Sequence, residues 1–292
     1  MASTPNDISP ASAQIFDRQR VRMHRERSAH DFSAHNFLHQ RAMVDIVDRL
    51  ETATRSFDRA LFIGAGNVEK LMTPTCKVGD IVHMDLATTR INAAKNAVAG
   101  DEEALPFANG SFDLVVSVLT LHCVNDFIGA LVQARMVLKP DGLFIAAIFG
   151  EGTLASLRTA LRRAEIEQSG ALASRIAPFA AIQDFGQALS RAGFALPVTD
   201  IDTVRVSYRE PIRLLKDLRG IGETNPLAGR IDPLRRATFF SALSNFQSEG
   251  SEEIFNIVYV TGWAPDESQQ KPLKPGSAKT SLADAVINSQ RS

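Results

Sequence analysis

The chain has 292 residues, 45% of them apolar, and a formal net charge of −1. This length suits one large α/β domain with an insertion, or two small domains, and the near-zero charge gives no general attraction to nucleic acid or to a membrane surface. Two cysteines, Cys76 and Cys123, are too few for a disulfide framework or a cysteine metal site, and no apolar run is long enough to span a bilayer.

The first part of the chain predicts a polar tail followed by helices. Residues 1–13 lack the apolar core of a secretory signal, and we expect them to be disordered. The basic segment at residues 18–27 is either a solvated helix face or an arm that grips an acidic partner or ligand. His35 and His39 have the spacing of a helical metal site, but no nearby Glu or Cys completes it, so we expect no metal. Residues 37–50 predict an amphipathic helix packed at a sheet edge.

A strand predicted at residues 60–63 leads into the loop Gly64-Ala65-Gly66. In a doubly wound sheet, the loop after the first strand lies at the carboxyl end of the strands, where ligands bind. Glycine lets the backbone approach a ligand closely, although Gly-x-Gly alone is also typical of an ordinary turn.

The second predicted strand, residues 81–85, ends in Asp85, about 20 residues after the glycine loop. A carboxylate at this place accepts two hydrogen bonds from the vicinal hydroxyls of a ribose. The alternative is a cap for a helix over residues 87–97. Asp101 and Glu102 follow a third strand region at residues 95–99 and are either ligand contacts or part of a solvated turn.

A β-α-β unit is predicted next. Residues 112–119 are apolar and rich in β-branched side chains, as in a strand buried on both faces. A helix over residues 127–138 stops at a Pro-Asp-Gly turn, and residues 143–149 predict another strand. His122 lies just past the first of these strands. It is a candidate acid/base or orienting group, or else a packed histidine.

The remainder predicts more helices, two more strands and a tail. The segments are helices at 152–168 and 180–192, a strand at 198–208, helices within 211–246 broken at 220–226, a final strand at 254–263, and a disordered tail at 264–292. Glycines around the break would allow residues 220–225 to act as a lid; the alternative is a plain loop.

Three motifs resemble the class I S-adenosylmethionine-dependent methyltransferases: DEEALPF from Asp101, SFDLVVS from Ser111 and LKPDG from Leu138. The motif LHCVND at residues 121–126 is similar to the branch that holds the malonyl-carrier-protein methyltransferase of biotin synthesis and the complex I assembly factor 5 family. The chain resembles the complex I assembly factor 5 family over more of its length, at residues 15–18, 176–179, 217–225 and 276–278.

The resemblance implies a fold and a division of the chain. The expected fold is an α/β, doubly wound, Rossmann-like sheet of seven strands with a helical insertion before the last, antiparallel strand. The expected divisions are residues 1–50 as N-terminal tail and helices, 51–263 as the methyltransferase-fold domain with its insertion at about 211–250, and 264–292 as the tail.

The resemblance also implies S-adenosylmethionine as cofactor. In the family, the glycine loop and an acid before it hold the methionyl part, and later acids hold ribose and adenine. The implied cofactor residues are Gly64, Ala65, Gly66, Asp85, Leu86, Asp101, Glu102 and Leu119. The chain departs from the family pattern at Phe62, where the acid is expected, at Val68, where the last glycine is expected, and at Cys123, where relatives carry Trp.

Three functions remain open at this stage. The resemblance implies an enzyme that hydroxylates an arginine of a quinone-side complex I subunit, although the sequence shows no 2-His-1-carboxylate set. The alternatives are methyl transfer to a carrier-bound acyl carboxylate or small molecule, and a non-catalytic assembly chaperone. No mitochondrial presequence is evident, so we expect a bacterial cytoplasmic protein, with peripheral contact to the inner membrane through complex I.

Overall fold

The computed structural model describes residues 14–66, 68–170, 172–229 and 232–269. The predicted disordered segments, residues 1–13 and most of the tail from 264, lie outside these residues, as does the resemblance at 276–278. Among the described residues, no helix combines the length and the apolarity needed to cross a membrane.

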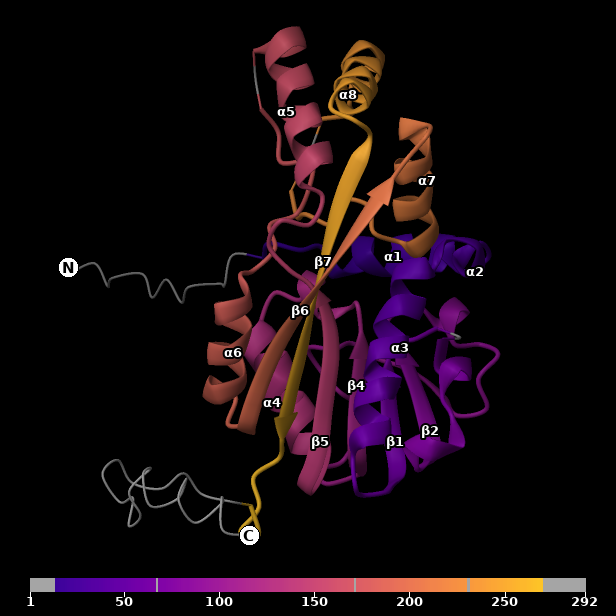
Figure 1. Ribbon diagram of the computed structural model, residues 1–292, viewed down its shortest axis with the longest axis vertical. Coiled ribbons are helices and arrows are strands. Elements are labelled where there is room, and N and C mark those ends of the chain that lie inside the picture. Colours follow the sequence, from indigo (N-terminus) through magenta and orange to yellow (C-terminus); the bar gives the residue numbers. More distant parts are fainter. Residues whose placement is uncertain (1–13, 67, 171, 230–231, 270–292) are drawn as a thin grey trace, which may run out of the picture.

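A seven-stranded sheet in the order β3-β2-β1-β4-β5-β7-β6 forms the centre of the described chain (Figure 1). β7 runs antiparallel to both of its neighbours, and the pairs from β3 to β5 are parallel. This confirms the predicted doubly wound sheet. The strands are β1 (Phe57–Ile63), β2 (Val78–Asp85), β3 (Ala97–Ala99), β4 (Phe112–Val118), β5 (Leu138–Phe149), β6 (Ala195–Ser207) and β7 (Glu252–Trp263).

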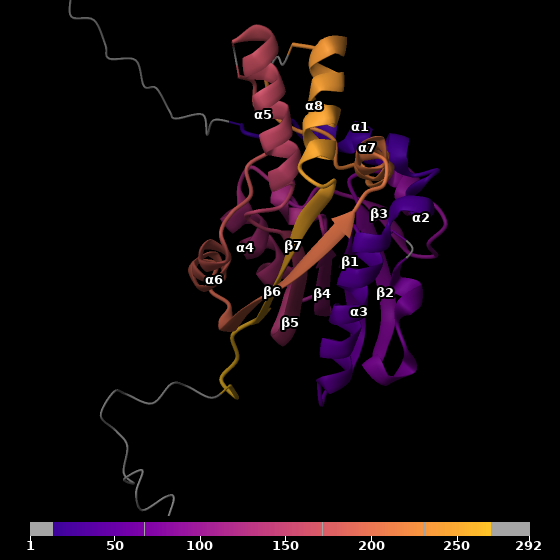
Figure 2. The same cartoon turned by 45° about the horizontal axis from the view of Figure 1, so that its top comes forward.

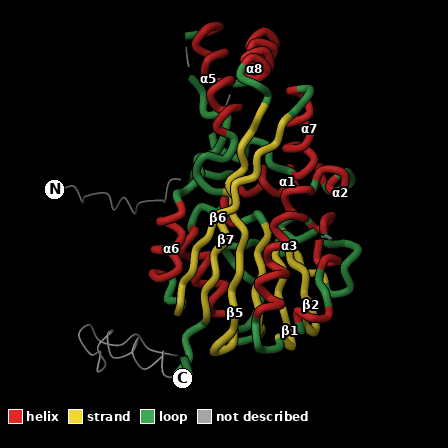
Figure 3. Tube along the Cα trace, in the orientation of Figure 1, coloured by secondary structure: helices red, strands yellow, loops and turns green. Residues whose placement is uncertain are grey.

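Helices cover both faces of the sheet and its carboxyl edge (Figures 1 and 3). α3 lies on one face, and α4 and α6 lie on the other, so apolar side chains form one core on each side of the strands. The helices are α1 (Arg18–Ser28), α2 (Phe32–His35), α3 (Phe37–Thr52), α4 (Phe127–Val137), α5 (Ala155–Ser169), α6 (Ile182–Arg191), α7 (Pro211–Ile221) and α8 (Arg236–Ser248).

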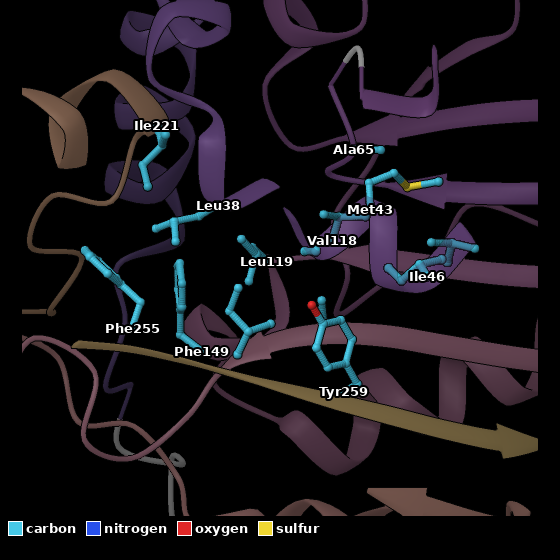
Figure 4. Close-up of a cluster of buried hydrophobic side chains, with 14 of the residues drawn as sticks. Leu38, Met43, Ile46, Ala65, Val118, Leu119, Phe149, Ile221, Phe255 and Tyr259 are labelled. Atoms are coloured by element: carbon cyan, nitrogen blue, oxygen red, sulfur yellow. The ribbon is translucent and has the colours of Figure 1, made fainter. Parts of the chain in front are cut away.

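α3 packs on a face of the sheet, and the prediction that it packs at an edge is wrong. Its apolar stripe is fully buried, and Figure 4 shows Met43 and Ile46 in one cluster with Val118 and Tyr259. The edge strand β3 is short and leaves two of its three residues exposed, so it offers too little apolar surface for this stripe.

The helix considered over residues 87–97 is also absent from the structure. A single 3-10 turn, Thr88–Arg90, is followed by turns, and Ala97 already belongs to β3. The backbone N–H of His83 donates to the carbonyl of Asn96 at 2.7 Å, so strand pairing begins where that helix would still continue.

α5, α7 and α8 rise above the carboxyl ends of the parallel strands (Figures 1 and 2). β6 and β7 are 13 and 12 residues long, and their antiparallel pairing extends beyond the sheet toward these helices. The long strand pair therefore carries a helical roof over the edge at which a doubly wound fold binds its ligands.

Candidate functional site

α1 lies across the carboxyl edge and covers the predicted cofactor acids. Asp17 caps the helix by accepting from the N–H of Arg20 at 3.0 Å. The Nη1 of Arg25 lies 2.9 Å from Oε1 of Glu102 and 3.6 Å from Oδ1 of Asp85. These three side chains are 3%, 1% and 0% exposed, so the basic segment grips acids of its own chain.

Arg18 completes this cluster of charges. Its guanidinium donates to both oxygens of Asp101, at 2.6 and 3.2 Å, and also to Glu102. Burial raises the pKa of the Glu102 carboxyl, but the positive charges of Arg25 and Arg18 lower it by more. The pKa of Glu102 is therefore about 2. The solvated-face interpretation therefore fails for Arg18 and Arg25, and holds for Arg22, whose side chain is 54% exposed.

The glycine loop is filled by neighbouring side chains. Gly64 and Gly66 have φ values of +70° and +61°, which side chains rarely adopt. A Cβ on Gly64 would lie 1.9 Å from Cγ2 of Thr120, and one on Gly66 would lie 2.7 Å from the ring of Phe32. Phe62, which replaces the family acid, is fully buried in the core. The loop thus makes a close approach to α2 where the family holds the methionyl group.

The predicted cofactor residues have suitable chemistry, but most of them are buried in this conformation. Oδ2 of Asp85 is a buried acceptor with no hydrogen-bond partner among the described residues, as a ribose-binding carboxylate would be before its ligand arrives. However, Ala65 and Leu119 are 2% and 1% exposed, and Arg25 lies against the acids. In this conformation α1 and Phe32 therefore occupy the space next to the predicted cofactor residues.

A second feature is a cavity of about 260 Å³ beside this cluster, under the roof of α5, α7 and α8. Its walls are mainly apolar, and six of the residues that form them are Phe149, Leu154, Leu157, Phe179, Leu218 and Phe255. His122, Cys123 and Glu223 line the same cavity, so a polar group of three side chains faces an apolar space.

His122 and Glu223 form an ion pair from distant parts of the chain. His122 follows β4 in a 3-10 turn, and Glu223 follows α7, whose C-terminus is closed by Gly222 at φ +84°. Nε2 of His122 lies 2.9 Å from Oε2 of Glu223. Burial lowers the pKa of His122, but Cys123 and Glu223 raise it more, to about 10.

The structure shows His122 as a packed histidine at the cavity wall, and its acid/base or orienting role stays a prediction. Its ring packs against Phe149 and Phe179, with centroids 5.0 and 6.0 Å away, and it also lines the cavity. The sequence reasoning missed Glu223 as a partner. The signal that could have found it is the resemblance at residues 217–225, which contains it.

His35 and His39 do not form a metal site together. Nδ1 of His35 lies 2.7 Å from Oδ1 of Asp217, whereas the ring of His39 packs edge-on against Phe32 at 4.8 Å. His39 is 1% exposed, and its Nδ1 has no hydrogen-bond partner in the described part of the chain. Burial and the charge of Arg90 lower its pKa to about 3.

Replacing Arg25 with Ala should lower the free energy of unfolding by about 3–5 kcal/mol, because it removes the cation paired with the buried Asp85 and one of the two cations paired with the buried Glu102. Arg22→Ala on the exposed side of α1 is the control and should cost less than about 1 kcal/mol. Urea unfolding measures both values. Equal, small losses would show that the buried pair does not hold α1 in place.

The neutral state of His39 predicts a pH dependence. The folded pKa is lower than the unfolded value of 6.5, so the unfolded chain binds the additional proton and stability falls as pH drops below about 6.5. Between pH 7 and pH 5, the wild type should lose about 2 kcal/mol more than His39→Gln. His30→Gln, at a side chain that is 95% exposed, should behave as the wild type. Parallel losses in all three proteins would refute this role of His39.

Comparison with known proteins agrees with the fold and identifies relatives. The family profile described as "Methyltransferase domain" matches residues 61–146. The YcgJ protein of Bacillus subtilis has a crystal structure that matches with a TM-score of 0.53 and 15% identity, over 77% of this chain and 99% of that one. At this identity the match shows the fold alone.

Sequence relatives cover most of the chain. The "Malonyl-[acyl-carrier protein] O-methyltransferase" of Methylovorus sp. is 27% identical over 87% of this chain and 92% of its own. The "Arginine-hydroxylase NDUFAF5, mitochondrial" of Danio rerio is 37% identical over 92% of this chain and 89% of its own, and that of Homo sapiens is 36% identical over 97% and 86%. With this identity over nearly the whole length of both chains, the protein belongs to the NDUFAF5 family of methyltransferase-fold enzymes.

Proposed function

We propose that this chain hydroxylates an arginine of a complex I subunit during assembly of the complex. The observation that carries the proposal is its 36–37% identity to arginine hydroxylases over 92–97% of the chain. The partner follows from the resemblance to complex I assembly factors at residues 15–18, 176–179 and 217–225. All three segments lie around the cavity and the start of α1.

The cavity suits a side chain with an apolar stem. The methylene groups of an arginine would lie along the apolar walls, with the polar group of His122, Cys123 and Glu223 within reach. Arg175 also lines the cavity, but its Nε lies 2.8 Å from Oε1 of Glu165, so its charge is neutralised. Arg175 therefore does not present an unneutralised positive charge that would repel the guanidinium of a bound arginine.

The proposed reaction replaces one C–H bond of the arginine with C–O–H. One oxygen atom comes from dioxygen, and the other leaves as water after uptake of two electrons and two protons from a reducing co-substrate. The chain's contribution is to bind the arginine and to hold it in the cavity under the helical roof, with the reacting carbon oriented for the reaction.

A second part of the proposal concerns S-adenosylmethionine, used across the methyltransferase superfamily. We assign it to the predicted residues around Asp85 and Glu102 in a conformation in which α1 has moved. The pairing with Arg25 leaves Oδ2 of Asp85 and Nη2 of Arg25 buried without hydrogen-bond partners among the residues that the structure describes, at a cost of about 1–3 kcal/mol for each group. A ribose hydroxyl on Asp85 would remove part of that cost.

The expected place of action follows from the partner. The chain would act in the bacterial cytoplasm and meet the inner membrane peripherally, through the complex I subunit that it modifies. Fractionation of cells with and without complex I tests this, because membrane association should depend on the complex.

Mass spectrometry of complex I subunits tests the proposed reaction. A strain without the gene should lack an arginine that carries one additional oxygen atom, and the wild-type gene should restore it. Glu223→Gln should fail to restore the modification, because it removes the carboxylate that pairs with His122. Glu26→Gln, at an exposed carboxylate on α1, should restore it and serves as the matched control.

The same experiment separates the alternatives. An added methylene group on the product, with loss of biotin prototrophy in the deletion strain, would favour methyl transfer. The covered acids at α1 favour a non-catalytic chaperone as the other alternative. That role would be indicated if complex I falls in the deletion strain, no arginine is modified in the wild type, and Glu223→Gln restores assembly.

Release of α1 should tighten cofactor binding. In calorimetry with S-adenosylmethionine, Arg25→Ala should bind at least about tenfold more tightly than the wild type, since the closed conformation loses its main ion pair. Arg22→Ala should bind as the wild type does. If Arg25→Ala does not fold, Arg18→Gln weakens the contact between α1 and the acids less severely. The Arg18→Gln protein should also bind S-adenosylmethionine more tightly than the wild type. Unchanged affinity in the folded variants would remove α1 as the barrier.

A further inference from the structure

We infer that His122, Cys123 and Glu223 bind a divalent transition-metal ion at the inner wall of the cavity. One donor atom from each side chain lies within 4.8 Å of the other two. A tetrahedral ion with bonds of about 2.0–2.3 Å holds its ligand atoms roughly 3.3–3.6 Å apart. The Nε2–Oε2 distance of 2.9 Å is shorter than this, so a small separation of the ion pair and a rotation of the thiol would complete the geometry.

The donor types indicate the class of metal. Imidazole nitrogen, thiolate sulfur and carboxylate oxygen together suit borderline ions such as Zn²⁺, Fe²⁺ and Co²⁺, whereas Mg²⁺ and Ca²⁺ prefer oxygen donors alone. The sequence reasoning looked for this chemistry at His35 and His39, whose rings have different neighbours and join no group of three donors among the described residues. The fold brings such donors together elsewhere, because the end of α7 places Glu223 next to His122 and Cys123 in the turn after β4.

The position of the three side chains matches a reactive metal centre better than a structural one. A structural zinc ion takes four protein ligands, whereas a catalytic ion keeps one position open for water or substrate. Only three donors meet here among the described residues, and all three line the 260 Å³ cavity. The open position of a bound ion would therefore face the space proposed for the arginine stem.

The surroundings provide the support that metal ligands need. Phe149 and Phe179 hold the imidazole ring, and Cys123 is 4% exposed within an apolar group that includes Phe16 and Ala177. Nδ1 of His122 is buried and has no hydrogen-bond partner in the described part of the chain, so the hydrogen bond that the second ring nitrogen of a metal-bound histidine usually makes would have to form when the ion binds.

This inference deepens the proposed function and rests on it only for the role of the ion. Hydroxylation by dioxygen commonly uses a redox-active metal, and the methyltransferase fold itself supplies none. The metal site stands on the geometry alone, so the two proposals can fail separately.

Cobalt binding to the full-length protein tests the site directly. Chelator-treated protein titrated with Co²⁺ should bind one equivalent and show the thiolate-to-cobalt charge-transfer absorption in the near ultraviolet. Cys123→Ser should lose that absorption, whereas Cys76→Ser should keep it, because Cys76 is buried elsewhere beneath α3. His122→Gln should weaken Co²⁺ binding by more than about 100-fold. Circular dichroism confirms that each variant is folded.

Two outcomes would overturn the inference. One is a folded wild type without the charge-transfer absorption at stoichiometric Co²⁺, together with fast alkylation of Cys123, which would make the three side chains a thiol, base and carboxylate set instead. The other is absorption that survives Cys123→Ser and disappears in Cys76→Ser. If the arginine is hydroxylated but the protein binds no metal, the metal site is refuted and the proposed function stands. If the protein binds metal but no arginine is hydroxylated, the metal site stands and the proposed function is refuted.

Discussion

The burial of the Arg25 guanidinium between Glu102 and Asp85 constrains the whole carboxyl edge of the sheet. Removing an ion from water costs several kcal/mol even inside a relaxed protein, so each of these charges needs the others. The pairing joins α1 to the end of β2 and to the turn after β3. The basic segment at residues 18–27 thereby becomes part of the buried structure at the carboxyl edge of the sheet.

Arg90 extends that connection to the cavity. Its guanidinium stacks over Phe32, donates to Oγ of Ser28 at 2.8 Å and also donates to the carbonyl of Ile221. Ile221 ends α7 two residues before Glu223, and Ser28 ends α1. One side chain thus touches both α1, which covers Asp85 and Glu102, and α7, which positions the carboxylate of Glu223 at the cavity. Displacement of α1 would remove contacts from both.

Local sequence patterns predicted the strands because the order of apolar and polar residues along a strand reflects which of its side chains are buried. β4, with all seven residues buried, follows directly from its apolar run. Asp85 and Glu102 lie at the carboxyl edge of the sheet, where the patterns predicted them, and their role in ligand binding stays a prediction. Their partner was not predictable, because Arg25 lies 77 positions from Glu102 and no periodicity records which charge meets which. The same applies to His122 and Glu223, which are 101 positions apart, and to the sheet face that α3 covers.

The place of the last strand has a consequence for folding. β7 lies between β5 and β6, so β6 has no sheet neighbour until residues 252–263 have been synthesised. Until then, β5 and β6 both present unpaired edges, which favour association with other chains. The roof helices α7 and α8 precede β7, and Phe255 of β7 lines the cavity beneath them. The nascent chain therefore completes its cavity last, after residues 252–263 have joined the sheet.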